Sequence, residues 1–372
     1  MSNFKTIVYA ISTLSGTIIG VGLFGLPYVT LQVGFWVILA YFGVLTALVI
    51  LVHQFFGELS LKTPDFKRIL GFAKIYLGYW GQKITLISIV LGFFGALLAY
   101  LIVGGEFFTE LLSPYFGGNN LLYTFLYFAI GAALIFYGIR AIAKVEFWGL
   151  ILFFIILIVI FFRGQTFIDV QNLFIGNWKL EAGNLFLPYG VILFSLWGAA
   201  LIPEVEEMLA HEKKKLKWVI PVGILIPALV YLFFIYLILG ISGVQTTESA
   251  LGGLKAVLGD GIVALALLFG LLTTFTSFIA VGLTLKKVFW YDLGLSKNLS
   301  WAITCFLPLI LFLAGLKSFI AVIGLVGGLL LGVDGILILL MYNKIRPERR
   351  FITYPLMLIF LVGILYSIIY FS

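Results

Sequence analysis

Long apolar stretches alternate with short polar connections along this 372-residue chain. An α-helix needs about 20 predominantly apolar residues to cross the hydrocarbon core of a bilayer, and stretches of that order recur throughout the sequence. We expect eleven membrane-spanning helices, near 6–32, 34–58, 84–112, 121–139, 143–162, 184–209, 217–240, 261–290, 299–315, 318–341 and 352–371. The pattern therefore predicts an all-α protein that crosses a membrane many times.

Two of the predicted helices contain signals that interrupt a helix. The first carries GTIIGVGLFGL at residues 16–26, with four glycines ahead of Pro27, and the sixth carries SLWGA at residues 195–199 ahead of Pro203. Irregular backbone at bilayer depth is tolerated only where protein or an aqueous cavity satisfies the freed amide and carbonyl groups. The two breaks therefore indicate a polar site inside the membrane.

The spacing of the breaks predicts the architecture. The second break falls five spans after the first, and five is an odd number, so the two breaks lie in halves of opposite orientation, as in transporters with inverted repeats. We expect repeats over about 1–163 and 184–341, which together form a ten-helix core at 1–341, and a peripheral eleventh helix at 342–372. Close helix packing is the alternative explanation of Gly16-x-x-x-Gly20, because small residues at this spacing are common at helix interfaces.

Composition supports a membrane protein and gives its orientation. The chain is 63% hydrophobic and 10% charged with a mean hydropathy of +1.19, values that a soluble domain of this size does not carry. If the amino terminus is cytoplasmic, all but four of the 23 lysines and arginines lie in inner segments, the exceptions being Arg163, Lys179, Lys255 and Lys317. This bias predicts a multi-pass protein of the plasma (cytoplasmic) membrane with a cytoplasmic amino terminus.

The net charge of +7 follows from the same bias, so we expect contact with membrane lipid and no nucleic-acid partner. The single cysteine, Cys305, excludes an internal disulfide, and the two histidines, His53 and His211, do not form a metal-binding motif. Phosphate-binding loops and paired acids at matched spacing are also missing from the sequence. We expect neither an enzyme nor a cofactor, and we infer no obligatory protein partner.

The two interrupted helices resemble a known family. GTIIGVGLFGLPY in the first helix and PYGVILFSLWGAALIPEVEEM in the sixth are similar to the broken helices of the amino acid/auxin permease family, within the amino acid–polyamine–organocation superfamily. The resemblance implies a LeuT-like fold with five-plus-five inverted repeats and coupled uptake of amino acids.

The first break suits a carboxylate. Unwinding exposes backbone amides beside the amino-terminal end of the next half-helix, which carries a partial positive charge. We predict that the amides of Gly20, Val21 and Gly22 hold the substrate carboxylate, with glycine permitting its close approach.

Carbonyl groups around both breaks suit the substrate ammonium group. We predict acceptors near Thr17 in the first helix and over Phe194, Ser195 and Leu196 in the sixth, with the Ser195 hydroxyl as a further partner. Trp197 is compatible with a gate or a side-chain pocket and equally with simple packing, and both interpretations stay open.

The eighth helix supplies a cluster of hydroxyl groups on one face. Thr273, Thr276 and Ser277 follow the i, i+3, i+4 spacing. The resemblance implies a sodium site formed by the carbonyls of Gly16, Ile19 and Thr273 and the hydroxyls of Thr276 and Ser277. The alternative is that these hydroxyls bond to carbonyls of their own helix.

Proton coupling is the competing scheme. The fifth helix has no ionisable residue in its core, which weakens a mechanism based on a lysine there. Acids inside a membrane are costly and are functional candidates by default, so Glu106 and Asp334 are predicted gate or coupling residues, with a solvated or locally paired acid as the alternative. His53 is more readily interpreted as a hydrogen-bonded packing residue than as a proton relay.

The sequence thus predicts a secondary active transporter that imports a neutral L-amino acid by alternating access, with sodium preferred as the coupling ion. A proton-coupled symporter and a non-transporting amino acid sensor on the same fold are the alternatives.

Overall fold

The computed structural model describes residues 3–64, 67–138, 142–175, 185–258 and 260–371, and within these ranges the ordered elements are all helical. The α-helices are α1 (Asn3–Ile18), α2 (Gly22–Val33), α3 (Phe35–Lys62), α4 (Ile69–Phe116), α5 (Asn120–Tyr137), α6 (Ile142–Gly164), α7 (Leu187–Leu196), α8 (Ile202–Met208), α9 (Leu216–Ser242), α10 (Lys255–Leu258), α11 (Asp260–Lys287), α12 (Lys297–Leu313), α13 (Phe319–Leu325), α14 (Leu331–Ile345) and α15 (Arg350–Phe371).

Shorter turns join or extend these helices. The 3-10 turns are Gln165–Phe167, Val170–Phe174, Ala199–Leu201, Ala210–Lys215, Gly243–Gln245, Gly252–Leu254 and Pro347–Arg349, and the π-helical turns are Val288–Asp292 and Val326–Leu330.

Each predicted span corresponds to helix in the described chain. Within the described residues, eight helices are long and apolar enough to cross a membrane, and α1 and α2 together form a ninth such segment that is bent by 56°. Two shorter apolar helices, Ile151–Phe167 and Lys297–Leu313, coincide with the remaining predicted spans. The prediction of an all-α protein with many membrane spans is therefore confirmed.

The long helix α4 differs from the prediction. The span was predicted at 84–112, whereas α4 begins at Ile69 and so includes most of the basic amphipathic stretch at 65–81 that precedes the span in the sequence. The connection is a kink at Gly78, whose φ of +72° lies in the region that favours glycine. Exposed Tyr79 and Trp80 follow the kink, and such amphipathic rings are common at membrane interfaces.

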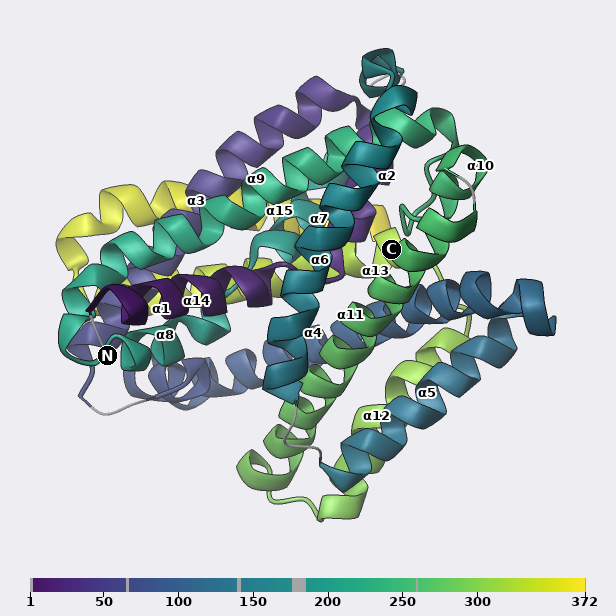
Figure 1. Cartoon of the computed structure of the whole chain (residues 1–372). Coiled ribbons are helices and arrows are strands. Elements are labelled where there is room, and N and C mark those ends of the chain that lie inside the picture. The colour runs from purple at the N-terminus through teal and green to yellow at the C-terminus, as the bar shows by residue number, and fades with distance from the viewer. Residues whose placement is uncertain (1–2, 65–66, 139–141, 176–184, 259, 372) are drawn as a thin grey trace.

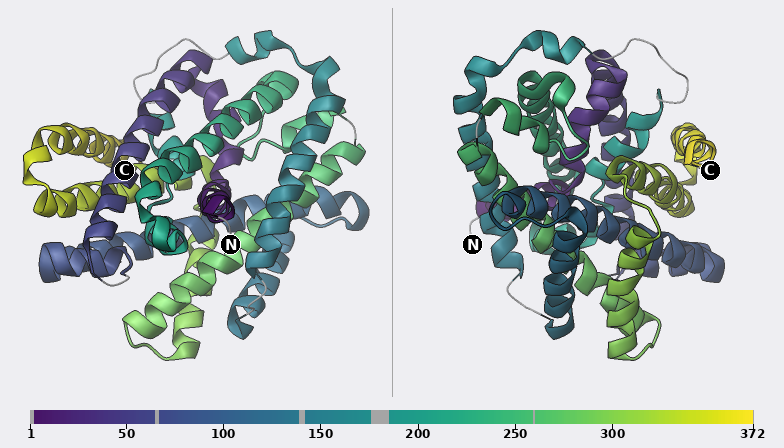
Figure 2. Two further views of the ribbon diagram at one scale, coloured as in Figure 1. Left: turned by 60° about the vertical axis from the view of Figure 1, so that its left-hand side comes forward. Right: turned by 90° about the vertical axis from the view of Figure 1, so that its right-hand side faces the viewer.

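The helices pack as two groups. In the first group, α4, α5, α11 and α12 contact one another, and α5 and α12 run side by side (Figure 1). In the second group, α9 contacts α1, α2 and α3, while α7 contacts α2 and α3. Helix α15 packs on α14 and lies at the edge of the molecule (Figure 2). Both interrupted helices thus lie in the second group, where α9 and α3 hold them.

Close backbone contact fixes α7 in this group. A Cβ atom built on Gly327 would overlap the carbonyl oxygen of Gly190, and one built on Gly190 would overlap the carbonyl oxygen of Gly324. Small residues let helices approach closely in membranes, where van der Waals packing contributes much of the association. The second interrupted helix therefore rests directly on the segment around the π-helical turn Val326–Leu330.

Candidate substrate and ion site

The first predicted break is present at Ile19, Gly20 and Val21, between α1 and α2. The backbone hydrogen bonds of α1 end where the Ile19 amide donates to the Ser15 carbonyl. Those of α2 begin where the Leu23 amide donates to the Gly20 carbonyl at 3.2 Å. Among the described residues, the amides of Gly20, Val21 and Gly22 donate in none of the backbone–backbone hydrogen bonds at this junction. These are the three amides predicted to hold a carboxylate.

The second break lies at Trp197 and Gly198, between α7 and the turn that leads into α8. The freed amide of Gly198 donates to Nε2 of His53 at 3.0 Å, and His53 is fully buried on α3. An imidazole nitrogen that accepts a hydrogen bond carries no proton, so His53 is neutral with its proton on Nδ1. His53 is therefore a hydrogen-bonded residue, as the sequence analysis favoured. The sequence did not identify Gly198 as its partner.

Trp197 packs beside that histidine. Its ring meets the His53 ring edge-on with centroids 5.0 Å apart, and Phe360 of α15 lies 6.3 Å away on a similar edge contact. Trp197 is half-buried, so the aromatic contacts fix its position without enclosing it completely.

The two breaks lie against each other. A Cβ atom on Gly22 would overlap the Ser195 hydroxyl and lie 3.0 Å from the Ser195 Cα. Neither Gly20 nor Gly22 is among the positive-φ glycines of the described chain, so close approach is what requires glycine at position 22. The Ser195 hydroxyl itself donates to Val191 in its own helix at 2.7 Å.

A buried tyrosine that the sequence analysis missed joins both breaks. The hydroxyl of Tyr231 on α9 contacts the Ile18 carbonyl at 2.5 Å and the Ser195 carbonyl at 3.0 Å. These carbonyls lie at the carboxyl ends of α1 and α7, where helix carbonyls lack amide partners. No local sequence signal marks Tyr231, because its partners are 213 and 36 residues away.

The last two turns of α1 before the first break have an open, polar face. Ser12 and Thr17 are exposed, and Thr13, Gly16 and Gly20 are half-exposed. Hydroxyls and small residues suit water or a polar solute better than lipid chains. Thr17, predicted near the ammonium group, therefore lies on this open face.

The predicted sodium positions fall into two separate sets. On α11, the Thr276 hydroxyl donates to the Thr273 carbonyl at 3.1 Å, and Ser277 is half-buried beside it. On the other side, Gly16 and Ile19 belong to the first interrupted helix. That helix packs mainly on α9, whereas α11 packs mainly on α4 and α6, and no hydrogen bond within the described ranges connects the two sets.

Glu106 lies in the last quarter of α4, towards its carboxyl end at Phe116. Its half-buried carboxyl faces the Ser249 hydroxyl in the connection between α9 and α11. The neighbouring Glu248 accepts hydrogen bonds from the Ser318 hydroxyl at 3.3 Å and the Ile320 amide at 3.2 Å. Glutamates thus hold this connection against α4 and α13.

Asp334 is buried in α14, with 7% of its surface exposed. Its Oδ1 atom has no hydrogen-bond partner among the described residues, and Asp334 takes part in none of their ion pairs. The Ser88 hydroxyl faces the carboxyl while it donates to the Leu330 carbonyl at 3.0 Å, at the end of the π-helical turn. Such turns often occur at functional sites.

Ion pairs hold α8, the half of the second interrupted helix that follows the break. Glu206 of α8 is buried, accepts from the Ser60 hydroxyl of α3 and pairs with Lys213 at 2.7 Å. Glu204 lies 3.9 Å from Arg68 at the start of α4. Two acids of α8, just after the second break, thus have basic partners.

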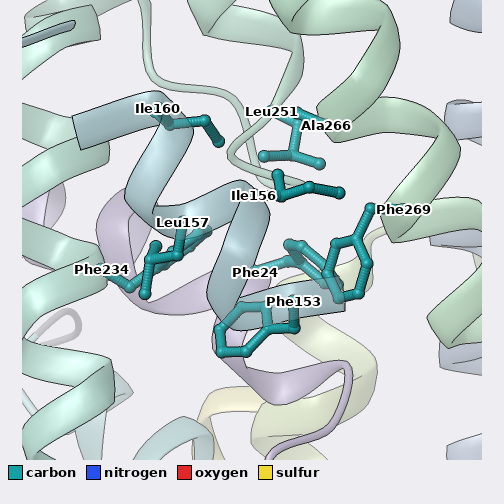
Figure 3. A pocket seen from close by; sticks show the side chains of 9 residues that line it. All are labelled: Phe24, Phe153, Ile156, Leu157, Ile160, Phe234, Leu251, Ala266 and Phe269. Carbon is teal, nitrogen blue, oxygen red and sulfur yellow. The ribbon is translucent and has the colours of Figure 1, made fainter. Parts of the chain in front are cut away.

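An apolar cavity adjoins the first break (Figure 3). Four phenylalanines line it, Phe24, Phe153, Phe234 and Phe269, together with five aliphatic side chains from α6, α11 and the connection that precedes α11. The cavity presents no polar group and has room for about one water molecule, so it is too small to hold a substrate side chain in this conformation.

Comparison with known proteins identifies the family. The tryptophan/tyrosine permease family matches residues 4–369, almost the whole chain. The chain belongs to this family. Its members and the relatives named below are permeases and transporters, so the expectation of a transporter and not an enzyme is confirmed.

Two curated relatives of this permease carry substrate names. "Tyrosine-specific transport system 1" of Haemophilus influenzae is 26% identical over 344 residues, which cover 84% of this chain and 82% of the relative. "Glutamine transporter 2" of Aliivibrio fischeri is 25% identical over 353 residues, which cover 88% of this chain and 86% of the relative.

Solved structures share the fold of the permease. The inward-facing conformation of Mhp1 gives a TM-score of 0.71 at 11% identity, covering 97% of this chain and 88% of that one. MhsT in complex with L-phenylalanine gives a TM-score of 0.60 at 14% identity, covering 95% of this chain and 98% of that one. These likenesses confirm the LeuT-like fold.

Proposed function

We propose that this permease is a secondary active transporter that imports a neutral L-amino acid by cation symport and alternating access. The observation that carries the proposal is the junction of the two broken helices, where the amides of Gly20 to Gly22 donate in no backbone–backbone hydrogen bond and the carbonyls of Ile18 and Ser195 share one side-chain partner. An amino acid presents a carboxylate and an ammonium group to one such junction.

The substrate is proposed to be neutral because the side-chain hydrogen bonds at the two breaks in the described chain come from Tyr231 and the neutral His53 and not from a charged group. The relatives named for tyrosine and glutamine support the same neutral class.

The remaining architecture is proposed on the sequence pattern. Repeats at about 1–163 and 184–341 form the ten-helix core, and residues 342–372 add a peripheral helix. A cytoplasmic amino terminus in the plasma membrane follows from the distribution of basic residues. The motifs of both broken helices support placement within the amino acid/auxin permease family of the larger superfamily.

Uptake into proteoliposomes tests the function directly. The purified permease is reconstituted and supplied with labelled tyrosine, phenylalanine, tryptophan, leucine and glutamine, with sodium and pH gradients imposed separately. We expect gradient-driven accumulation of at least one of these amino acids. Measurable binding without flux would instead favour a sensor on the same fold, and neither binding nor flux would refute the proposal.

Sodium is the proposed coupling ion, held by the carbonyls of Gly16, Ile19 and Thr273 and the hydroxyls of Thr276 and Ser277. Removing both hydroxyls, in Thr276→Ala with Ser277→Ala, is expected to abolish sodium-driven accumulation, because a hard cation needs these oxygen ligands. The measurement is uptake against external sodium concentration, with Thr284→Ala, an exposed hydroxyl of the same helix, as the control. Unchanged sodium dependence in the double variant would contradict the assignment.

A proton is the second candidate ion, and the burial of Asp334 favours it. A carboxyl inside the membrane without a basic partner is stable only when protonated, so exposure during transport would release its proton. If protons drive transport, Asp334→Asn is expected to abolish accumulation driven by a pH gradient while exchange of internal for external substrate persists. Glu106→Gln tests the other candidate acid in the same assay. Accumulation driven by a pH gradient that survives Asp334→Asn would exclude Asp334 as the carrier.

A further inference from the structure

Tyr231 lies between the two interrupted helices, and its hydroxyl contacts both of them. It is fully buried, and its hydroxyl lies 2.5 Å from the Ile18 carbonyl and 3.0 Å from the Ser195 carbonyl. The Gly20 amide faces the same hydroxyl. One atom on α9 is therefore the common partner of a carbonyl from each break.

The hydroxyl has a single proton, so it cannot satisfy both carbonyls fully. Each carbonyl oxygen has two acceptor positions, and the shared proton leaves most of this capacity unused in a region without bulk water. Both oxygens lie within 3.0 Å of one atom, so they are close enough for one ammonium group to reach both at ordinary hydrogen-bond lengths.

The Ile18 and Ser195 carbonyls need a partner such as the Tyr231 hydroxyl to fix their orientation. Ile18 and Ser195 are each followed closely by non-helical residues, so the ladder does not fix the orientation of their carbonyls. Helix α9 is itself anchored to α1, because the Ser15 hydroxyl donates to the Gly223 carbonyl at 3.0 Å. Pro227 cannot supply the amide that would normally bond Gly223, so this anchor satisfies a carbonyl that the proline leaves free.

We infer that Tyr231 is a positioning residue, which holds the Ile18 and Ser195 carbonyls convergent so that they bind the ammonium group of the substrate. The inference rests on the proposed amino acid transport. It assigns the ammonium contact to Ile18 and Ser195, where the sequence analysis had placed it near Thr17 and over Phe194 to Leu196. The side chain of Tyr231 acts through these two carbonyls.

Tyr231→Phe is the test, since it removes only the hydroxyl. The readout is the preference for an amino acid over its deaminated analogue, measured as the dissociation constant of the analogue divided by that of the amino acid. The two pairs are 3-(4-hydroxyphenyl)propionate with L-tyrosine and 4-carbamoylbutyrate with L-glutamine. We expect the ratio to fall about tenfold or more, because a hydrogen bond to a charged group is lost only for the amine. Equal weakening of amino acid and analogue would mean a purely structural role and would overturn the inference.

Amide hydrogen exchange without ligand provides an independent readout. In Tyr231→Phe, peptides covering 14–24 and 193–201 are expected to exchange faster than in the wild type, because both breaks lose their common partner. Tyr189→Phe is the matched control, a tyrosine of α7 that is 4% exposed and whose hydroxyl has no hydrogen-bond partner in the described chain. Unchanged exchange in Tyr231→Phe would overturn the inference, whereas a wild-type protein that binds none of the four probes would refute the proposed substrate class alone.

Discussion

Gly20→Val is expected to abolish substrate binding and to leave the protein folded. Gly20 is half-exposed at the first break, and a Cβ atom there would meet its nearest neighbour, the Tyr100 hydroxyl, at an ordinary 3.6 Å. The branched methyl groups would nevertheless occupy the space in front of the amides proposed to bind the carboxylate. We expect affinity to fall about 100-fold or more, equivalent to about 2.7 kcal/mol of binding free energy.

The measurement combines equilibrium binding of L-tyrosine and L-glutamine with thermal unfolding of the purified protein in detergent. Gly43→Val is the matched control, because Gly43 is an exposed glycine of α3 with no atom within 4 Å of an added Cβ. Wild-type affinity in Gly20→Val would contradict the carboxylate cradle. Gly22 is less informative, since its Cβ would overlap Ser195 and force the two breaks apart.

Gly327→Ala is expected to destabilise the fold itself, by about 3 kcal/mol or more of unfolding free energy. The added Cβ would overlap the Gly190 carbonyl oxygen and lie 2.8 Å from the amide nitrogen of Phe194. These are backbone atoms of α7, so no side-chain rotation relieves the overlap. The segment around Gly327 and α7 would have to separate, and the second break lies at the end of that helix.

The thermal unfolding midpoint and the yield of monodisperse protein report this effect. Gly92→Ala is the control, because Gly92 is a helical glycine of α4 whose added Cβ would meet nothing within 4 Å. Alanine is the better helix former, so the control is expected to be neutral or slightly stabilising. A midpoint in Gly327→Ala equal to that of the wild type would contradict the proposed backbone contact.

The two interrupted helices show how far local pattern reaches. Four glycines before Pro27 predicted the first break, and it is present between Ile18 and Gly22. The second break was predicted from Trp197 and Gly198 ahead of Pro203, and it is present there as well. Glycine and proline alter the backbone where they stand, so a single sequence is sufficient to locate such breaks.

Other features needed the assembled helices. The hydroxyls of the eighth span lie on one face as their spacing requires, yet their distance from the first break depends on how α11 packs, and the structure places α11 against α4 and α6. The joining of the amphipathic stretch to α4 depends on the φ of Gly78, which no hydrophobic pattern specifies.

The sequence by itself determined that this permease is a bundle of membrane-spanning helices, and it also determined where two of them break. Its basic residues predict the orientation of the bundle. Apolar length, glycine, proline and charge act locally, so one sequence is enough for these statements. Only the tertiary structure decided which side chains satisfy the broken backbone. His53 reaches Gly198 across 145 residues and Tyr231 reaches Ile18 across 213. The packing of the helices in space brings these partners together, and no periodic pattern of residues along the chain marks them.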